Sequence, residues 1–156
     1  MSRVIAIDPG YTESAWCVLE GDRPLSFGKE PNSDVLIRVR REWSPLDDKD
    51  LLAVEMIASY GMPVGREVFD TCLWIGRYIE AWERRQGKYA LVYRRDVKMH
   101  LCNSARAKDS NVRAALLDRY GPGREKAIGT KRAPGPLYGL KGDGWSALAV
   151  ALKAAA

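Results

Sequence analysis

The chain has 156 residues, of which 46% are hydrophobic and 29% are charged. These values are typical of a soluble globular domain with a sizeable core, and they exclude fibrous proteins, disordered chains and mini-proteins. Lysine and arginine exceed aspartate and glutamate by 25 to 20, which gives a formal net charge of +5. A charge of this size identifies no partner by itself, so its distribution along the chain matters more than its sum.

The N-terminal third predicts three strands and a short helix. Residues 4–7 form an uninterrupted apolar run that ends at Asp8, a pattern typical of a strand buried on both faces. Residues 14–20 and 24–29 predict two more strands joined by a tight turn, which makes a three-strand meander. A short helix follows over residues 32–43.

The middle of the chain repeats the first pattern, because the apolar run 51–54 is followed at once by Glu55. The longest predicted helix covers about residues 66–85, and residues 89–93 predict a fifth strand. The inner face of the long helix is predicted to carry Phe69, Cys72, Leu73, Gly76, Ile79 and Trp82. Three further apolar residues lie beyond that face and are available to cover a partner subunit: Trp74, Ile75 and Tyr78.

The last third predicts helices over residues 96–101 and 110–120, a glycine-rich loop over 121–142 and a final helix over 145–153 that Asp143 precedes as a cap. The order of strands and helices indicates an α/β domain with a mixed sheet. Its first part should be antiparallel, and it should become parallel where helices intervene. We therefore expect one domain that spans residues 1–156.

Three widely spaced cysteines and a single histidine offer neither a disulfide framework nor a zinc site. The N-terminal apolar run is too short for a signal peptide, and no uncharged apolar stretch reaches membrane-spanning length. We therefore expect a reduced protein of the cytoplasm that has no membrane partner.

The positive charge is concentrated in one quarter of the chain. Residues 94–132 carry eleven lysines and arginines and four aspartates and glutamates, so the rest of the chain has a net charge of −2. A surface that faces a polyanion would produce this pattern. A solvated basic loop would produce it equally well, and the charge alone favours neither interpretation.

Two acids follow buried strands in the same way. If the strands that Asp8 and Glu55 end are parallel neighbours, both carboxylates emerge at the carboxyl edge of the sheet, where ligands collect in α/β folds. Close like charges are costly unless a cation lies between them, and Mg²⁺ needs only one or two carboxylates with water and substrate phosphate. A single acid at a strand end is more often a turn former, but the matched pair favours a metal site. Asp143 could simply cap the last helix.

Three segments resemble, in order and spacing, the acidic motifs of the RuvC-like Holliday junction resolvases, which belong to the RNase H-like (retroviral integrase) superfamily. They are Val-Ile-Ala-Ile-Asp-Pro-Gly at 4–10, Leu-Ala-Val-Glu at 52–55 and Gly-Asp-Gly-Trp-Ser-Ala-Leu-Ala-Val-Ala-Leu at 142–152. The likeness is greatest to small phage-type proteins and covers nearly the whole chain. It implies an RNase H-like mixed five-stranded sheet flanked by helices, a homodimer, and Mg²⁺- or Mn²⁺-dependent cutting of branched DNA. A phage-encoded protein would act in the host cytoplasm.

Carried over residue by residue, the resemblance implies that Asp8, Glu55 and Asp143 are catalytic metal ligands. The family pattern places a second acid or a histidine three residues further along the last helix, where this chain has Ser146. Either Asp143 performs both roles, or a distant acid such as Asp109 completes the ligand set. In a two-ion scheme Asp8 would bridge both ions, Glu55 would bind one and Asp143 the other.

The implied reaction is hydrolysis of phosphodiester bonds to leave 5′-phosphate ends. Lys108, in a segment that resembles the family's basic stretch, is the candidate for a cation that faces the phosphate. Tyr60, between small residues, could stack on unpaired bases at a crossover; a core or lid tyrosine is the equal alternative. The residues expected to contact the DNA backbone are Arg106, Lys108, Arg113, Lys131 and Arg132.

Two other functions remain open. An RNase H-type, flap or fork nuclease would use the same fold and metals, whereas a catalytically weak branched-DNA-binding protein would account for Ser146. An actin-like protein with a nucleotide cofactor is disfavoured, because the chain is too short for two lobes and lacks a second glycine-rich phosphate motif.

Overall fold

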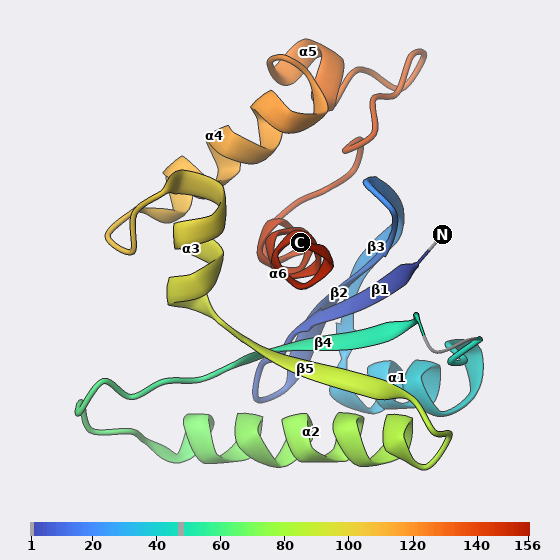
Figure 1. The fold of residues 1–156 in the computed structure, drawn as a ribbon, viewed down its shortest axis with the longest axis vertical. Coiled ribbons are helices and arrows are strands. Elements are labelled where there is room, and N and C mark those ends of the chain that lie inside the picture. Colours follow the sequence, from blue (N-terminus) through green and yellow to red (C-terminus); the bar gives the residue numbers. More distant parts are fainter. Residues whose placement is uncertain (1, 47–48) are drawn as a thin grey trace.

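A five-stranded mixed sheet forms the centre of the protein in the computed structural model, which describes residues 2–46 and 49–156 (Figure 1). The strands are β1 (Arg3–Asp8), β2 (Glu13–Glu20), β3 (Arg23–Pro31), β4 (Leu51–Met56) and β5 (Lys88–Tyr93). Their order in the sheet is β3-β2-β1-β4-β5. The first three form an antiparallel meander, while β4 is parallel to both β1 and β5. This confirms the predicted α/β class and mixed five-stranded sheet.

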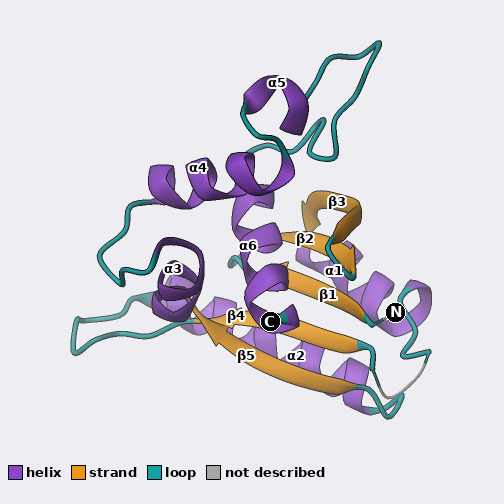
Figure 2. Ribbon diagram, turned by 45° about the horizontal axis from the view of Figure 1, so that its top comes forward, coloured by secondary structure: helices purple, strands orange, loops and turns teal. Residues whose placement is uncertain are grey.

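Helices cover both faces of this sheet. They are α1 (Asn32–Ile37), which continues as the π-helical segment η1 (Arg38–Glu42), α2 (Arg66–Glu83), α3 (Arg94–Cys102), α4 (Asp109–Tyr120), α5 (Arg124–Ala127) and α6 (Gly144–Ala155). Helices α1 and α2 lie on one face, and α3 and α6 lie on the other, with α4 and α5 farther from the sheet (Figures 1 and 2). Among the described residues, no helix combines the length and apolar character needed to cross a bilayer.

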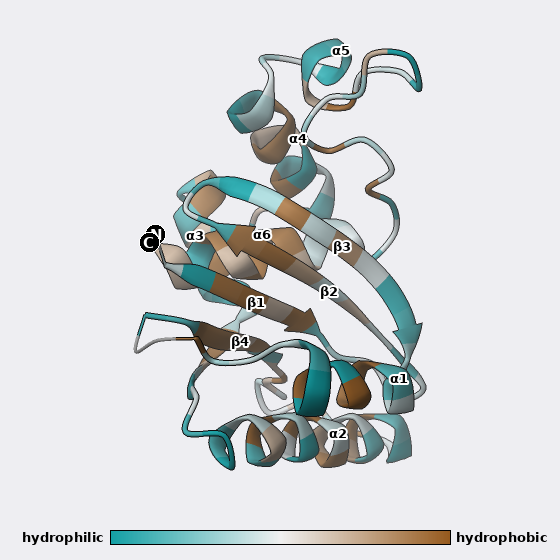
Figure 3. Cartoon of the chain, turned by 90° about the vertical axis from the view of Figure 1, so that its right-hand side faces the viewer, coloured by the Kyte–Doolittle hydropathy of each residue, from teal (hydrophilic) through white to brown (hydrophobic). Residues whose placement is uncertain are grey.

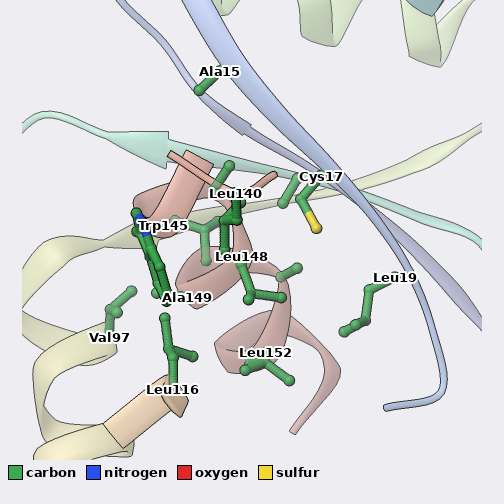
Figure 4. Close-up of a cluster of buried hydrophobic side chains, with 14 of the residues drawn as sticks. Ala15, Cys17, Leu19, Val97, Leu116, Leu140, Trp145, Leu148, Ala149 and Leu152 are labelled. Atoms are coloured by element: carbon green, nitrogen blue, oxygen red, sulfur yellow. The ribbon is translucent and has the colours of Figure 1, made fainter. Parts of the chain in front are cut away.

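Helix α6 is the central element of its face. It packs on β1 and β2, and it is almost entirely apolar between Trp145 and Leu152. Figure 4 shows the buried cluster that Leu148 and Leu152 form with Cys17 and Leu19 of β2. The hydrophobic residues accordingly concentrate on β1, β2 and α6, whereas the edge strand β3 is mixed (Figure 3). This packing holds the start of α6 against the sheet.

Helix α2 turns a different face to the sheet from the predicted one. Of the six residues predicted to face inward, only Trp82 is buried, while Phe69 and Leu73 are 61% and 68% exposed. The buried residues are Thr71, Ile75, Tyr78, Ala81 and Trp82. Helix α2 has two apolar stripes, and the one that faces the sheet carries the large rings. The polar atoms of these rings are hydrogen-bonded there: the Trp82 indole donates to the Lys88 carbonyl at 2.9 Å.

The three residues predicted to cover a partner subunit lie in or against the core instead. Ile75 and Tyr78 are fully packed, and Trp74 is half-buried beside them. The exposed apolar residues of α2 are therefore Phe69 and Leu73, on the opposite side of the helix.

The segment 121–142, predicted as one loop, contains the short helix α5 and folds back on the core. Ala127, Leu137 and Leu140 are buried in the cluster around α6. The backbone N–H of Leu137 donates to the Ala127 carbonyl at 2.8 Å, which closes the segment on itself. Because local propensity here is that of a loop, this tertiary packing left no signal in the sequence.

Candidate active site at the carboxyl ends of three parallel strands

The carboxyl ends of β1, β4 and β5 meet at one edge of the sheet. Ile7 pairs with Val54, and Val54 in turn pairs with Leu91. Asp8 and Glu55, one residue further along, therefore lie side by side. The structure brings together the two acids whose matched positions suggested a metal site.

Burial raises the pKa of both carboxyl groups. The pKa of Asp8 rises from 3.8 to about 8, first because the group is desolvated and then because Glu55 and Asp143 are negatively charged. Burial also raises the pKa of Glu55, although the positive charge of Arg94 opposes the shift. Two buried neighbouring carboxylates ionise together only if positive charge lies between them. The Asp8–Glu55 pair therefore fits a divalent cation bound by oxygen ligands.

Arg94 brings a positive charge to the same edge. It is the first residue of α3 and directly follows β5, which is adjacent to β4. Its Nη1 donates to the Ser146 hydroxyl at 3.0 Å and lies 3.8 Å from Oε1 of Glu55, and its Nη2 donates to Asp109 at 2.5 Å. Ser146 in turn donates to Glu55 at 3.4 Å. The bond from Arg94 holds the pKa of Asp109 below its ordinary value.

Asp143 stands at the start of α6, but its carboxylate does not cap the helix. It accepts a hydrogen bond from the Lys29 ammonium of β3 at 2.7 Å instead, and this bond raises the pKa of Lys29. The Asp143 side chain is 58% exposed and that of Asp109 is 81% exposed. Both acids thus lie at the rim of the site, each paired with a cation.

The predicted ligand set of Asp8, Glu55, Asp143 and Asp109 is not drawn together in this arrangement. Among the residues that the structure describes, no three histidine, cysteine, aspartate or glutamate side chains form a group that could hold a metal ion. The buried pair offers the oxygen ligands for one ion. In the structure, Asp143 is bonded to Lys29 and Asp109 to Arg94.

Two hollows share Arg94, which lies 3.8 Å from Glu55, as a common wall. The first, of about 280 Å³, is lined by Asp109, Arg113, Asp143 and Ser146 among others. The guanidinium of Arg113 lies over the ring of Trp145, 5.1 Å from its centre. The second hollow, of about 240 Å³, is lined by Tyr60, Arg94, Arg95, Lys98 and Ala105.

Tyr60 is 68% exposed, which excludes the alternative of a core tyrosine. It lies in the segment between β4 and α2, so that it follows Glu55 by five residues. Its φ of 50° is unusual for a residue with a side chain. The ring therefore stands in solvent beside two basic residues of α3, Arg95 and Lys98.

The basic segment 94–132 divides between the site and the rest of the surface. Arg113 lines the first hollow, and Arg106 and Lys108 are exposed just before α4. Arg119 pairs with Asp22 at 2.7 Å instead. Lys131 and Arg132 are exposed in the loop between α5 and α6, and α5 lies on the part of the molecule farthest from α2 (Figure 1).

Two residues of the site were missed by reasoning from the sequence. Arg94 directly follows the parallel strand β5, while Asp8 is the last residue of β1 and Glu55 the last but one of β4. The rule that singled out the two acids could therefore have found Arg94. Lys29 reaches Asp143 across 114 residues of chain, and no local pattern marks that contact.

Comparison with known proteins establishes the fold. No protein-family model and no curated protein matches the chain. Two solved structures of RuvC from Thermus thermophilus, one of them a complex with a Holliday junction substrate, superimpose with a TM-score of 0.67 and 18% sequence identity. The alignments cover 97% and 98% of this chain and 92% of each RuvC chain. The chain therefore has the RNase H-like fold of RuvC over nearly its whole length.

Proposed function

We propose that the chain is a divalent-metal-dependent endonuclease that cuts four-way DNA junctions. The observation that carries this proposal is the buried Asp8–Glu55 pair at the carboxyl ends of parallel strands, which needs a cation in order to ionise. The RuvC fold supports the same function, because one of the matched RuvC structures holds a Holliday junction substrate.

Asp8 and Glu55 would hold the ion, and their carboxylate oxygens suit Mg²⁺ or Mn²⁺. When bound there, the ion would offset charge on a phosphodiester and lower the pKa of a water, so that hydrolysis leaves a 5′-phosphate end. Asp143 can contribute to the same site once Lys29 exchanges its carboxylate partner for a DNA phosphate. Lys108, exposed at the start of α4, is the candidate cation for the backbone near the cut.

DNA would lie across the two hollows that share Arg94. Arg106 and Arg113 would contact phosphates on one side, and Lys131 and Arg132 would extend the contact along the duplex arm. Tyr60, exposed beside Arg95 and Lys98, would stack on a base that is unpaired at the crossover. These contacts recognise backbone and shape, so binding should weaken steeply as salt increases.

Cutting both strands of a junction requires two active sites, which a two-fold homodimer supplies. The outer face of α2 is our candidate for the dimer surface, because Phe69 and Leu73 are exposed there with Gly76 between them and the sheet-facing residues. Large apolar side chains on one helix face are typical of a surface that a partner covers.

A cleavage assay on four substrates tests the proposal. Four-way, flap, RNA–DNA hybrid and linear duplex substrates are incubated with Mg²⁺ and the wild-type chain, Asp8→Asn or the matched control Asp34→Asn, whose side chain lies on the exposed side of α1. We expect wild type and Asp34→Asn to cut the four-way substrate best, and Asp8→Asn to lose several orders of magnitude in rate. Cleavage that survives Asp8→Asn, or equal cutting of linear duplex, overturns the proposal.

A second candidate is a branched-DNA-binding protein with weak catalysis. It is favoured by Ser146 at the place of an expected acid and by the pairing of Asp143 with Lys29. Repeating the cleavage assay in Mn²⁺ and measuring binding to the four-way substrate separates the two, since this candidate binds that substrate tightly but leaves it intact in both Mg²⁺ and Mn²⁺. Preferred cutting of the hybrid or the flap would favour the RNase H-type or flap nuclease.

A further inference from the structure

We propose that the guanidinium of Arg94 takes the place of a second metal ion, so that the active site binds one divalent cation per chain. The inference rests on the proposed function, because it concerns the ion that Asp8 and Glu55 would hold. It departs from the two-ion scheme that the sequence resemblance implies.

Arg94 is bonded to the two groups that could complete the ligands of a second ion beside Asp143, namely the residue at position 146 and Asp109. Its two terminal nitrogens donate to Ser146 at 3.0 Å and to Asp109 at 2.5 Å, and the first of them lies 3.8 Å from Glu55. A guanidinium cannot lose its charge at physiological pH. A second divalent ion in this corner would therefore meet a fixed positive charge at close range, which opposes its binding.

The charges around the site also favour a single ion. Four carboxylates face it, from Asp8, Glu55, Asp109 and Asp143, and two cations, Arg94 and Lys29, are bonded to the outer pair. The two inner carboxylates remain unbalanced, and one divalent ion balances them. A second ion would leave an excess of positive charge before any phosphate is bound.

Ser146 and Arg94 act as one unit in this arrangement. The Ser146 hydroxyl accepts a hydrogen bond from Arg94 and donates one to Glu55 at 3.4 Å. It therefore connects the guanidinium of Arg94 to the Asp8–Glu55 pair. An acid at position 146 would form an ion pair with Arg94, which would weaken it as a metal ligand. A second metal site should therefore need both changes at once, Ser146→Asp and Arg94→Gln.

The test counts Mn²⁺ ions on the full chain, without DNA, by isothermal titration calorimetry and by electron paramagnetic resonance. We expect one ion per chain in wild type, in Ser146→Asp and in the matched control Arg95→Gln, which removes the same charge from the next residue of α3. The double variant Arg94→Gln/Ser146→Asp should bind two ions, which are spin-coupled at the roughly 4 Å separation of two-metal sites.

Two ions on the wild-type chain would overturn this inference and leave the proposed function intact. No bound ion on a wild-type chain that is folded would instead sink the proposed function. A folded double variant that still binds one ion would show that Arg94 does not exclude the second. If the double variant does not fold, the number of Mn²⁺ ions on the wild-type chain decides by itself whether the site binds one ion or two.

Discussion

Asp8 is the residue in which stability and the proposed metal binding oppose each other most directly. The sheet that buries it removes the carboxyl group from water, and the charges of Glu55 and Asp143 add to the cost of ionising it. A bound cation reverses both effects, because it favours the ionised form. The metal-free protein should therefore lose stability as Asp8 ionises, and a bound cation should restore it.

The pH dependence of stability tests this directly. In the unfolded chain Asp8 ionises near its ordinary pKa of 3.8, whereas in the folded, metal-free protein it keeps its proton up to about pH 8. Between these two pH values the folded state binds more protons than the unfolded state. The free energy of unfolding therefore falls as pH rises from about 4 to about 8. Thermal or urea unfolding in a chelator should show a loss on the order of a few kcal/mol.

Asp8→Asn removes the titrating group, so most of this slope should disappear, and the variant should be more stable than wild type at pH 8. Asp34→Asn, on exposed surface, should keep the wild-type slope. At pH 8, Mg²⁺ should raise the free energy of unfolding of the wild-type protein, but it should not raise that of Asp8→Asn. A wild-type profile that is flat between pH 4 and 8 contradicts the assigned ionisation of Asp8.

Tyr60 carries the prediction for branch recognition. If its ring stacks on one unpaired base, Tyr60→Ala should weaken binding to a four-way substrate by about 1–3 kcal/mol, which is about five- to hundredfold in Kd. Tyr60→Phe keeps the ring and should bind as wild type does. Fluorescence anisotropy measures both. An equal loss on linear duplex would show that Tyr60 supports general DNA binding and does not sense the branch.

At the scale of elements, a buried polar network joins β2, α1 and α2 beneath the loop that follows Asp8. Ser14 donates to Asn32 at 2.6 Å, Tyr78 donates to the same oxygen at 3.1 Å, and Asn32 donates to the Gly10 carbonyl at 2.9 Å. A Cβ on Gly10 would lie 2.3 Å from the Glu13 carbonyl oxygen, so only glycine fits this turn. The network thereby holds the end of β1 in place.

Removal of the Tyr78 hydroxyl tests how much this network stabilises the fold. Tyr78→Phe leaves Ser14 and Asn32 buried with one partner fewer, which should lower the free energy of unfolding by about 1–2 kcal/mol. Tyr138→Phe is the matched control, since this tyrosine is 43% exposed, and it should change stability by less than about 0.5 kcal/mol. Equal effects of the two substitutions in urea unfolding would show that the network contributes nothing.

The elements also show what the sequence could and could not predict. The strands that Asp8 and Glu55 end are short continuous apolar runs, a local signal, and the structure has them where they were predicted. The inward face of α2 was mistaken because two apolar stripes fit the helical period, and only the shape of the sheet selects between them. The contact of Lys29 with Asp143 depends on the tertiary fold alone.

At the scale of the whole molecule, the proposed paired cutting depends on a dimer surface, for which the exposed face of α2 is the candidate. If Phe69 and Leu73 form the homodimer surface, Leu73→Glu should bury a charge there and raise the dimer Kd at least about tenfold. Sedimentation equilibrium measures this. Leu25→Glu, an equally drastic change on the edge strand β3, should leave the dimer intact. A wild-type chain that is monomeric at high concentration contradicts the dimer and, with it, paired cutting by this surface.

The acids and the basic segment belong to different parts of the chain, and the fold brings only part of the basic charge to the acids. Arg94 and Arg113 line the hollow beside Asp143, while Arg119 is paired with Asp22 elsewhere. The charge excess of residues 94–132 is thus neither all a DNA surface nor all solvated loop. The sequence could show the excess but not this division.

The location of bound Mn²⁺ in a crystal of the wild-type protein tests the central claim most directly. An anomalous difference map from crystals grown with Mn²⁺, at a concentration that supports cleavage, should show a peak in contact with the carboxylates of both Asp8 and Glu55. Crystals of Asp8→Asn should lack that peak. A peak at other residues, or none at Asp8 and Glu55 in the wild type, would contradict the account.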